Sequence, residues 1–203
     1  MTPPPVERPR AVPDEAGRGG PRHVDSVAAL ARSASPTARS GSTVVVAIDG
    51  RSGSGKTELG TAVAAALGCP VVHLDALYPG WDGLQAGVDL LTTHVLEPLG
   101  RGERPAYPRW DWVRDRPGRT VGVDAGDLLV VEGCGALVPP AAAFAAVRVW
   151  LDAPDDLRKE RALSRDGDTY APHWDRWAAQ EDAVYAAARP MDSADLVLAT
   201  GQP

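Results

Sequence analysis

Residues 50–57 read Gly-Arg-Ser-Gly-Ser-Gly-Lys-Thr, and this stretch carries the strongest structural signal in the chain. It satisfies the pattern G-x-x-x-x-G-K-[ST], in which a lysine and a hydroxyl residue follow a glycine-bounded turn. An apolar run over residues 43–49 precedes it, and a helical pattern over residues 56–67 follows. Because the pattern requires this order of strand, loop and helix, the sequence predicts a loop that binds phosphate groups.

The residue types of this loop predict its chemistry. Glycines let the backbone curl until successive amide hydrogens face a phosphate, and the start of the next helix adds the positive end of its dipole. Lys56 should reach the β and γ phosphates of ATP or GTP, and the Thr57 hydroxyl should bind Mg²⁺. A glycine-rich turn that only joins strand to helix is the alternative. The predicted nucleotide-binding residues are Gly50, Ser52, Gly53, Ser54, Gly55, Lys56 and Thr57.

Composition argues against several other classes of protein. The chain has 203 residues and a formal net charge of −6, which disfavours a broad nucleic-acid surface. Because no apolar run reaches the roughly 20 residues that cross a bilayer, we expect no membrane contact. Cys69 and Cys134 lack metal or redox spacing, so we expect buried thiols in a reducing, cytoplasmic compartment. Association into a homo-oligomer stays open.

The chain divides by composition into a tail and one domain. Residues 1–40 are rich in Pro, Arg, Gly and Ser, so we expect a disordered tail with a short helix over residues 25–34. Residues 41–203 have the size of one ordinary domain. Apolar runs with little polar alternation, typical of strands in a parallel sheet, cover residues 43–49, 71–74, 127–132, 147–152 and 196–199.

Helical patterns alternate with these strands, which predicts the P-loop NTPase class of α/β fold. We expect a doubly wound, five-stranded parallel sheet with helices on both faces. Residues 104–123 break the alternation and carry a turn signal at Pro117-Gly118, so we expect a small inserted hairpin there. The predicted helices cover residues 56–67, 84–99, 139–146, 155–166 and 172–188.

Acidic residues end several of the predicted strands. In open α/β sheets ligands bind beyond the carboxyl ends of the strands, so such acids point toward a substrate. Glu132 could hold Mg²⁺, and Asp75 could take a proton from a hydroxyl that attacks the γ-phosphate. Asp49 could support the phosphate loop from behind, whereas Asp152 is a candidate helix cap. A capping role is the alternative for all of these acids.

Several ordered motifs resemble one known family, the uridine-cytidine kinases and their phosphoribulokinase relatives among the P-loop kinases. The similarity extends over about residues 44–200, nearly the whole predicted domain. It rests on the phosphate loop and on four later segments. These are Asp75-Ala-Leu-Tyr78, Trp110-Asp-Trp112, Val-Val-Glu132-Gly and Ser164-Arg165-Asp166.

The resemblance implies catalytic roles for particular residues. It implies that Asp75 is the general base and that Glu132 joins Thr57 around Mg²⁺. It also places Arg161 and Arg165 in a lid, over about residues 158–170, that closes on the transferred phosphate. The spacing of Arg158, Arg161 and Arg165 puts them on one helical face, which supports the lid independently. A solvated face paired with Asp155, Asp156 and Glu160 is the alternative.

The resemblance also implies an acceptor pocket. Asp82 stands near the acid that binds sugar hydroxyls in the family, while Tyr78, Trp110 and Trp112 would form walls for a flat base. Packing in the core or hairpin is the alternative for the tryptophans. The family's hairpin usually reads Tyr-x-Phe with a histidine after it, whereas Asp115 stands where that histidine is expected. The remaining histidines with no evident partner, His73, His94 and His173, are interpreted as structural.

Three functions agree with this pattern of residues. The first is an ATP- or GTP-dependent kinase that phosphorylates a hydroxyl of a small molecule, with a uridine- or cytidine-like nucleoside as the best candidate. The second is a nucleoside monophosphate kinase, which needs arginines at the acceptor such as Arg109, Arg114 and Arg116. The third is a regulatory NTPase without a small acceptor. Asp75 discriminates between them, because only a kinase for alcohols needs a base at that position.

Overall fold

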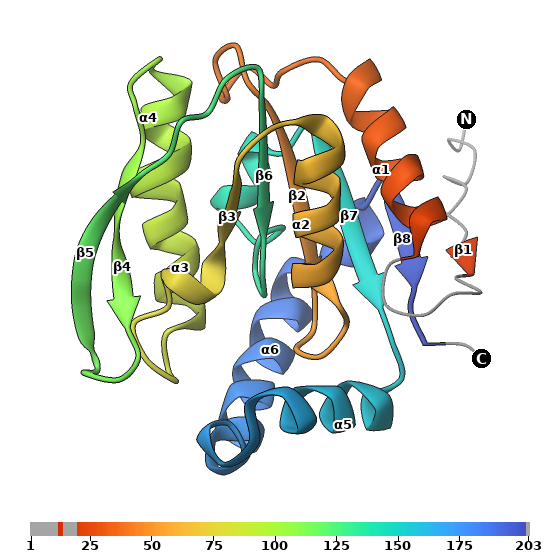
Figure 1. The fold of residues 1–203 in the computed structure, drawn as a ribbon, viewed down its shortest axis with the longest axis vertical. Coiled ribbons are helices and arrows are strands. Elements are labelled where there is room, and N and C mark those ends of the chain that lie inside the picture. The colour runs from red at the N-terminus through yellow and green to blue at the C-terminus, as the bar shows by residue number, and fades with distance from the viewer. Residues whose placement is uncertain (1–11, 14–19, 202–203) are drawn as a thin grey trace, which may run out of the picture.

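A parallel sheet of six strands forms the centre of the computed structural model, which describes residues 12–13 and 20–201 (Figure 1). All five predicted strands are present, and the two-residue β1 adds a sixth at the edge beside β8, which the prediction of five did not include. The phosphate loop leaves β2, which lies between β7 and β6. In spatial order the strands are β1 (Val12–Pro13), β8 (Leu196–Ala199), β7 (Val147–Asp152), β2 (Val44–Gly50), β6 (Leu128–Glu132) and β3 (Val71–His73).

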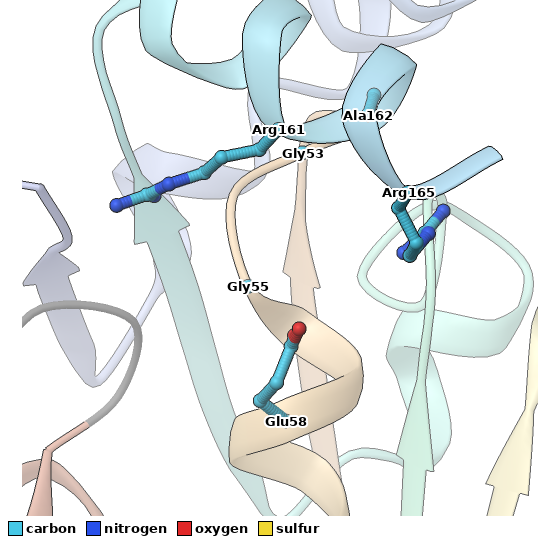
Figure 2. Close-up of a pocket in the computed structure, with 6 residues that line it drawn as sticks. All are labelled: Gly53, Gly55, Glu58, Arg161, Ala162 and Arg165. Carbon is cyan, nitrogen blue, oxygen red and sulfur yellow. The ribbon is translucent and has the colours of Figure 1, made fainter. Parts of the chain in front are cut away.

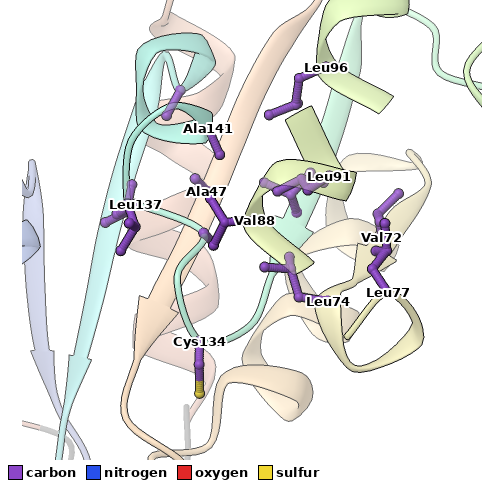
Figure 3. Packing of buried hydrophobic residues seen from close by; sticks show 14 of the residues in the cluster. Ala47, Val72, Leu74, Leu77, Val88, Leu91, Leu96, Cys134, Leu137 and Ala141 are labelled. Carbon is purple, nitrogen blue, oxygen red and sulfur yellow. The ribbon is translucent and has the colours of Figure 1, made fainter. Parts of the chain in front are cut away.

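Helices cover both faces of this sheet, as predicted. Successive residues of β2 point to opposite faces. Val46 and Ile48 therefore join a cluster with α1 and α2, whereas Val45 and Ala47 join the larger cluster with α3 and α6, part of which Figure 3 shows. Within the described residues, no helix is long and apolar enough to cross a membrane. The helices are α1 (Pro21–Ser33), α2 (Lys56–Leu67), α3 (Leu84–Leu91), α4 (Glu97–Gly100), α5 (Asp155–Asp166) and α6 (Trp174–Ala188).

The helix predicted over residues 84–99 is interrupted. A π-helical turn, Thr92–Leu96, separates α3 from α4. The Thr92 and Thr93 hydroxyls donate to the carbonyls of Val88 and Asp89, each at 2.9 Å, and such back-bonding disturbs the regular helical ladder. The predicted helix over residues 139–146 is only a short 3-10 turn, Ala141–Phe144, whereas α5 has the predicted bounds.

The prediction of a disordered tail over residues 1–40 is wrong for residues 21–33, which form helix α1. Helix α1 begins at Pro21, earlier than the predicted 25–34, and buries Val27, Ala28 and Ala31 against α2 and the sheet. The Pro- and Arg-rich composition of the first 40 residues concealed this short apolar stripe. Residues 1–11 and 14–19 of the expected tail lie outside the described residues.

The predicted hairpin exists, but its turn lies elsewhere. Strands β4 (Ala106–Asp111) and β5 (Arg116–Gly122) pair antiparallel as a separate two-stranded sheet. The turn covers residues 112–115, and Asp115 adopts a left-handed conformation with φ of 48°. Pro117 and Gly118 instead lie in β5, beside an irregularity between Pro108 and Trp110. A Cβ on Gly118 would lie 2.9 Å from the Arg109 carbonyl oxygen, so this glycine serves close strand approach.

Candidate functional site

The phosphate loop, residues 50–57, curls between the end of β2 and the start of α2. Gly53 and Gly55 have φ of 81° and 99°, in the left-handed region that favours glycine. A Cβ on Gly53 would lie 2.1 Å from the carbonyl oxygen of Arg158 in α5. The absence of a side chain at Gly53 therefore allows the backbone of α5 to contact the loop.

The Lys56 side chain is buried beneath this loop. Its Nζ donates a hydrogen bond of 3.0 Å to the Arg51 carbonyl oxygen. Burial acts to lower the pKa of Lys56, but negative groups that include Glu181 and Glu132 outweigh it, and the pKa is raised. The ammonium group therefore stays charged over the physiological range.

A small pocket lies between the phosphate loop and α5 (Figure 2). It measures about 80 Å³. In Figure 2, Arg161 and Arg165 extend from α5 in different directions, Gly53 lies against α5, and Gly55 and Glu58 lie below them on the loop and the start of α2. The structure thus brings the predicted lid arginines to the predicted phosphate site. The lining residues are Gly53, Gly55, Glu58, Arg161, Ala162 and Arg165.

The three arginines of α5 divide between two tasks. Arg158 is buried, pairs with Asp155 at 2.5 Å and donates to the Ser52 carbonyl oxygen at 3.0 Å, so it fastens α5 to the loop. Arg161 donates to the Thr200 hydroxyl at 3.3 Å. Arg165 pairs with the neighbouring Asp166, which raises the pKa of the guanidinium. Of these three arginines, only Arg161 and Arg165 line the pocket.

Glu132 ends β6 as a buried carboxylate with two partners. The Thr57 hydroxyl donates to it, with oxygen–oxygen distances of 3.3 and 3.4 Å. His73 Nδ1 lies 2.5 Å from Glu132 Oε1, and this hydrogen bond raises the pKa of the imidazole. Sequence reasoning missed His73. The parallel register could have found it, because His73 and Glu132 are direct neighbours on β3 and β6.

Asp75 lies two residues after the end of β3, in the 3-10 segment Leu74–Ala76. Its side chain is exposed toward solvent, yet protein atoms crowd the carboxyl group enough to raise its pKa, and the charge of Glu132 raises it further. The positive charges of Lys56 and Arg165 act in the opposite direction. These four groups therefore share one electrostatic environment at the carboxyl ends of the strands.

The residues around Glu132 and Thr57 fit a magnesium ion. Mg²⁺ prefers oxygen ligands, and in nucleotide sites it takes one or two protein oxygens together with phosphates and water. The Thr57 hydroxyl and the Glu132 carboxylate lie within hydrogen-bond distance of each other beside the phosphate loop. A donor set of this kind can hold the ion only together with a bound triphosphate.

Tyr78 does not form a wall of the cleft, which corrects its assignment to the acceptor pocket. It is 1% exposed and donates to the Cys134 carbonyl oxygen at 2.8 Å. Its ring meets Trp177 edge-on, with centroids 4.8 Å apart. A Cβ on Gly87 would lie 2.3 Å from this ring, so helix α3 packs directly on it.

Trp81, and not Tyr78, belongs to an aromatic cluster that reaches the backbone of Asp75. Its half-buried ring stacks on His173 and Tyr170 with centroids 4.6 and 5.1 Å apart, and it lies 4.8 Å from the ring of Trp112. Trp112 in turn donates from Nε1 to the Asp75 carbonyl oxygen at 2.8 Å. The aromatic cluster thus joins the loop after β3, the hairpin turn and the segment between α5 and α6. Neither Trp81 nor its partners His173 and Tyr170 were predicted as site residues.

Two other predicted acceptor residues have different surroundings. Trp110 lines an open groove of the hairpin with Arg109, Asp111, Trp112, Gly118 and Arg119. Its indole nitrogen is buried and has no hydrogen-bond partner among the described residues. Asp82 is exposed and forms a two-pronged ion pair with Arg176 of α6. That pair holds the Asp82 carboxylate against α6.

Asp49 lies directly behind the phosphate loop and is fully buried. Its carboxylate accepts hydrogen bonds from the amides of Gly50, Gly135 and Leu137 at 2.7–2.9 Å and from the Tyr185 hydroxyl at 2.7 Å. Burial raises the pKa of Asp49, and the hydrogen bonds oppose that rise. The carboxylate therefore joins β2, the loop after β6 and α6 at one point.

Comparisons with known proteins agree with this architecture. The chain can be superposed on the structure of a protein described as a possible uridine kinase from Bacillus stearothermophilus, with a TM-score of 0.64 and 22% identity over 86% of this chain and 96% of that one. The chain has the P-loop α/β fold. It is also 36% identical over 124 residues to the cytidylate kinase of Deinococcus radiodurans, a match that covers 54% of this chain and 53% of that protein. The chain thus matches about half the length of that curated relative. No family model matches it.

Proposed function

We propose that the protein is an ATP- or GTP-dependent kinase that transfers the γ-phosphoryl group to a hydroxyl of a small molecule. One observation carries this proposal: the phosphate loop, Glu132, Asp75 and the arginines of α5 meet at the carboxyl ends of β2, β6 and β3. A phosphate site needs the loop and the arginines. A nearby carboxylate that faces solvent adds the base that an alcohol acceptor requires.

The proposed chemistry is mainly positioning and charge stabilisation, because the transition state of phosphoryl transfer is loose. Asp75 accepts the proton of the acceptor hydroxyl, whose oxygen attacks the γ-phosphorus as the bond to the β-phosphate oxygen breaks. Lys56, Arg161 and Arg165 stabilise the negative charge on the transferred group and on the departing ADP or GDP. Mg²⁺ held by Thr57 and Glu132 would neutralise charge on the β and γ phosphates.

A nucleoside is our first candidate for the acceptor. The hairpin turn brings Trp112 to the backbone of Asp75, and Trp81 lies against it, so flat rings stand beside the proposed base. Such rings suit a pyrimidine, which would stack on them. The similarity to a protein named cytidylate kinase also favours a pyrimidine compound. In this proposal the hairpin binds the acceptor and α5 is the lid.

Transfer to a nucleoside monophosphate is the second candidate. Arg109 and Arg119 line the hairpin groove, and neither forms an ion pair with an acid among the described residues. Arg109 also lies close enough to the site for its charge to act on His73. Two such guanidinium groups could hold the phosphate of an acceptor nucleotide.

A screen for acceptor-dependent ADP release tests the proposal and separates the candidates. Nucleosides, their monophosphates and free sugars are offered with Mg²⁺ and either ATP or GTP. Formation of a nucleoside monophosphate supports the first candidate, whereas formation of a diphosphate supports the second. Hydrolysis that no acceptor accelerates would contradict both and favour a regulatory NTPase.

Two variants test the proposed roles within the same assay. Asp75→Asn should lower turnover by roughly two to four orders of magnitude and leave ATP affinity nearly unchanged, as for loss of a general base. Lys56→Ala should weaken ATP binding as well as turnover. Normal turnover of the Asp75 variant with a nucleoside would remove this residue from its role.

A further inference from the structure

A third buried carboxylate, Glu181 of α6, lies against the phosphate loop and has no part in the proposed chemistry. It is 1% exposed. Its Oε1 accepts three hydrogen bonds, from the Ser52 amide at 2.8 Å, the Trp177 indole nitrogen at 3.0 Å and the Cys134 thiol at 3.2 Å. Its Oε2 lies 3.8 Å from Arg51 Nη1. One oxygen atom thus connects α6, the phosphate loop and the loop after β6.

The location of Glu181 is electrostatically unfavourable for a site that binds phosphates. A buried negative charge repels a triphosphate, and removing a carboxylate from water is costly unless it is fully hydrogen-bonded. The positive charges of Lys56 and Arg51 lie close enough to act on Glu181. The hydrogen bond from the Ser52 amide gives a structural role that explains why a carboxylate occupies this position.

The hydrogen bond from the Ser52 amide to Glu181 helps to fix the shape of the loop. The amide hydrogen points to Glu181 in α6, and Ser52 is followed by the left-handed Gly53. Without an acceptor this half-buried amide would be free to seek another partner, and the turn at residues 51–53 would lose its fixed orientation. Arg51, the residue before Ser52, forms an ion pair with Asp182 at 2.6 Å on the exposed side of α6, and such surface pairs contribute little to stability.

We propose that Glu181 is a positioning residue that holds the phosphate loop in its nucleotide-binding shape by accepting the Ser52 amide hydrogen. The hydrogen bond, and not the negative charge, carries this role. Because α6 follows α5, the proposed lid helix, in the chain, the same contact also holds the phosphate loop in a fixed position relative to the end of the lid that joins α6. This inference rests on the proposed nucleotide binding by the loop.

Two substitutions separate the hydrogen bond from the charge. Glu181→Gln keeps an oxygen that can accept from Ser52, Trp177 and Cys134 but removes the charge. Glu181→Asp keeps the charge but shortens the side chain by one methylene, which withdraws the acceptor from the Ser52 amide. Asp182→Ala is the matched control, since Asp182 pairs with the same Arg51 from the exposed side of α6.

The measurement is the affinity for Mg·ATP by calorimetry, together with amide exchange at Ser52 followed by NMR. We expect Glu181→Asp to weaken affinity about tenfold, the effect of a lost hydrogen bond of roughly 1.4 kcal/mol, and to speed exchange of the Ser52 amide. Glu181→Gln and Asp182→Ala should stay within about threefold of the native affinity. Thermal unfolding of each variant shows whether a change in affinity merely follows a change in stability.

The outcomes are distinguishable from a failure of the proposed function. If the native protein does not bind Mg·ATP, the proposed function fails, whatever the variants do. If the native protein binds and Glu181→Asp binds equally well with a protected Ser52 amide, only the positioning role is overturned. A Glu181→Gln protein that binds much more weakly than Glu181→Asp would also overturn it, because charge would then be the property that matters.

Discussion

Replacing Gly60 of α2 by alanine should disturb the proposed magnesium site, although alanine favours the helix. Gly60 lies in the second turn after the phosphate loop, and a Cβ there would lie 2.8 Å from Cγ and 3.2 Å from Cβ of Glu132. Real Cβ atoms do not approach so closely, so the Glu132 side chain must move. It has little room to do so, because it is 2% exposed and held by Thr57 and His73.

The expected change in stability is a difference between two opposing terms. Alanine gains roughly 1 kcal/mol over glycine in a helix interior. Overpacking a close contact costs about 1–3 kcal/mol, so we expect the free energy of unfolding to fall by roughly 0–2 kcal/mol. For a chain of this size that corresponds to a decrease in Tm of at most about 8 °C. Ala65→Gly, at an exposed site of the same helix, should cost about 1 kcal/mol and calibrates the propensity term.

The substitution should also change the dependence of turnover on Mg²⁺. Displacing the Glu132 carboxylate from Thr57 should raise the Mg²⁺ concentration needed for half-maximal turnover by about tenfold or more, the usual effect of disturbing a group that orients a metal ligand. The assay is a Mg²⁺ titration of turnover at fixed ATP, paired with urea unfolding. A Gly60→Ala protein that is more stable than the native one and has an unchanged Mg²⁺ dependence would refute the argument.

Three further predictions concern proton transfer, the lid and the N-terminal helix. Because the Asp75 pKa is raised, its carboxyl group takes up a proton at a higher pH than usual. The value of kcat/KM should therefore fall with decreasing pH through a midpoint above 3.8. If the same fall in kcat/KM at low pH persists in Asp75→Asn, Asp75 is excluded as its source. Trp81→Ala removes the stacking that attaches the segment after α5 to the proposed acceptor side. Turnover, measured from initial rates, should drop at least several-fold, while ATP affinity, measured by calorimetry, should stay within about twofold. A change in ATP affinity with unchanged turnover would contradict this. Val27→Asp buries a charge where α1 meets the sheet and should lower the unfolding free energy by about 3 kcal/mol or more in urea, whereas an unchanged midpoint would show that α1 does not contribute to the core.

The sequence was sufficient to predict the sheet and the loop because both depend on local patterns. The apolar run ending at Asp49, the glycines and Lys56 identify the strand, the turn and the helix within about 25 residues. The strand ends then placed Glu132 and Asp75 at one edge of the sheet by topology alone. Each of these inferences needs only the period of the side chains and the direction of the strands.

Contacts between distant segments could not be predicted in this way. Glu181 meets Ser52 across 129 positions, and Asp82 meets Arg176 across 94. Nothing in the local sequence distinguishes Glu181 from the exposed Asp182 that follows it; only the phase of α6 on the sheet turns one inward and the other outward. The same holds for α1, whose apolar stripe acquires meaning only when a surface to cover is known.

The local sequence contains a signal from which the burial of Tyr78 could have been predicted. The Leu74 carbonyl accepts hydrogen bonds from the amides of Leu77 and Tyr78, so the chain turns helically after β3. Helical spacing then places Leu74, Leu77 and Tyr78 together on the inner side and Asp75 on the outer side. Gly80, with φ of 77°, reverses the chain before Trp81. Had residues 74–78 been interpreted as a turn of helix, Tyr78 would have followed Leu74 into the core. Trp81, whose ring lies 4.8 Å from that of Trp112, would then have been the next aromatic residue to consider beside Asp75.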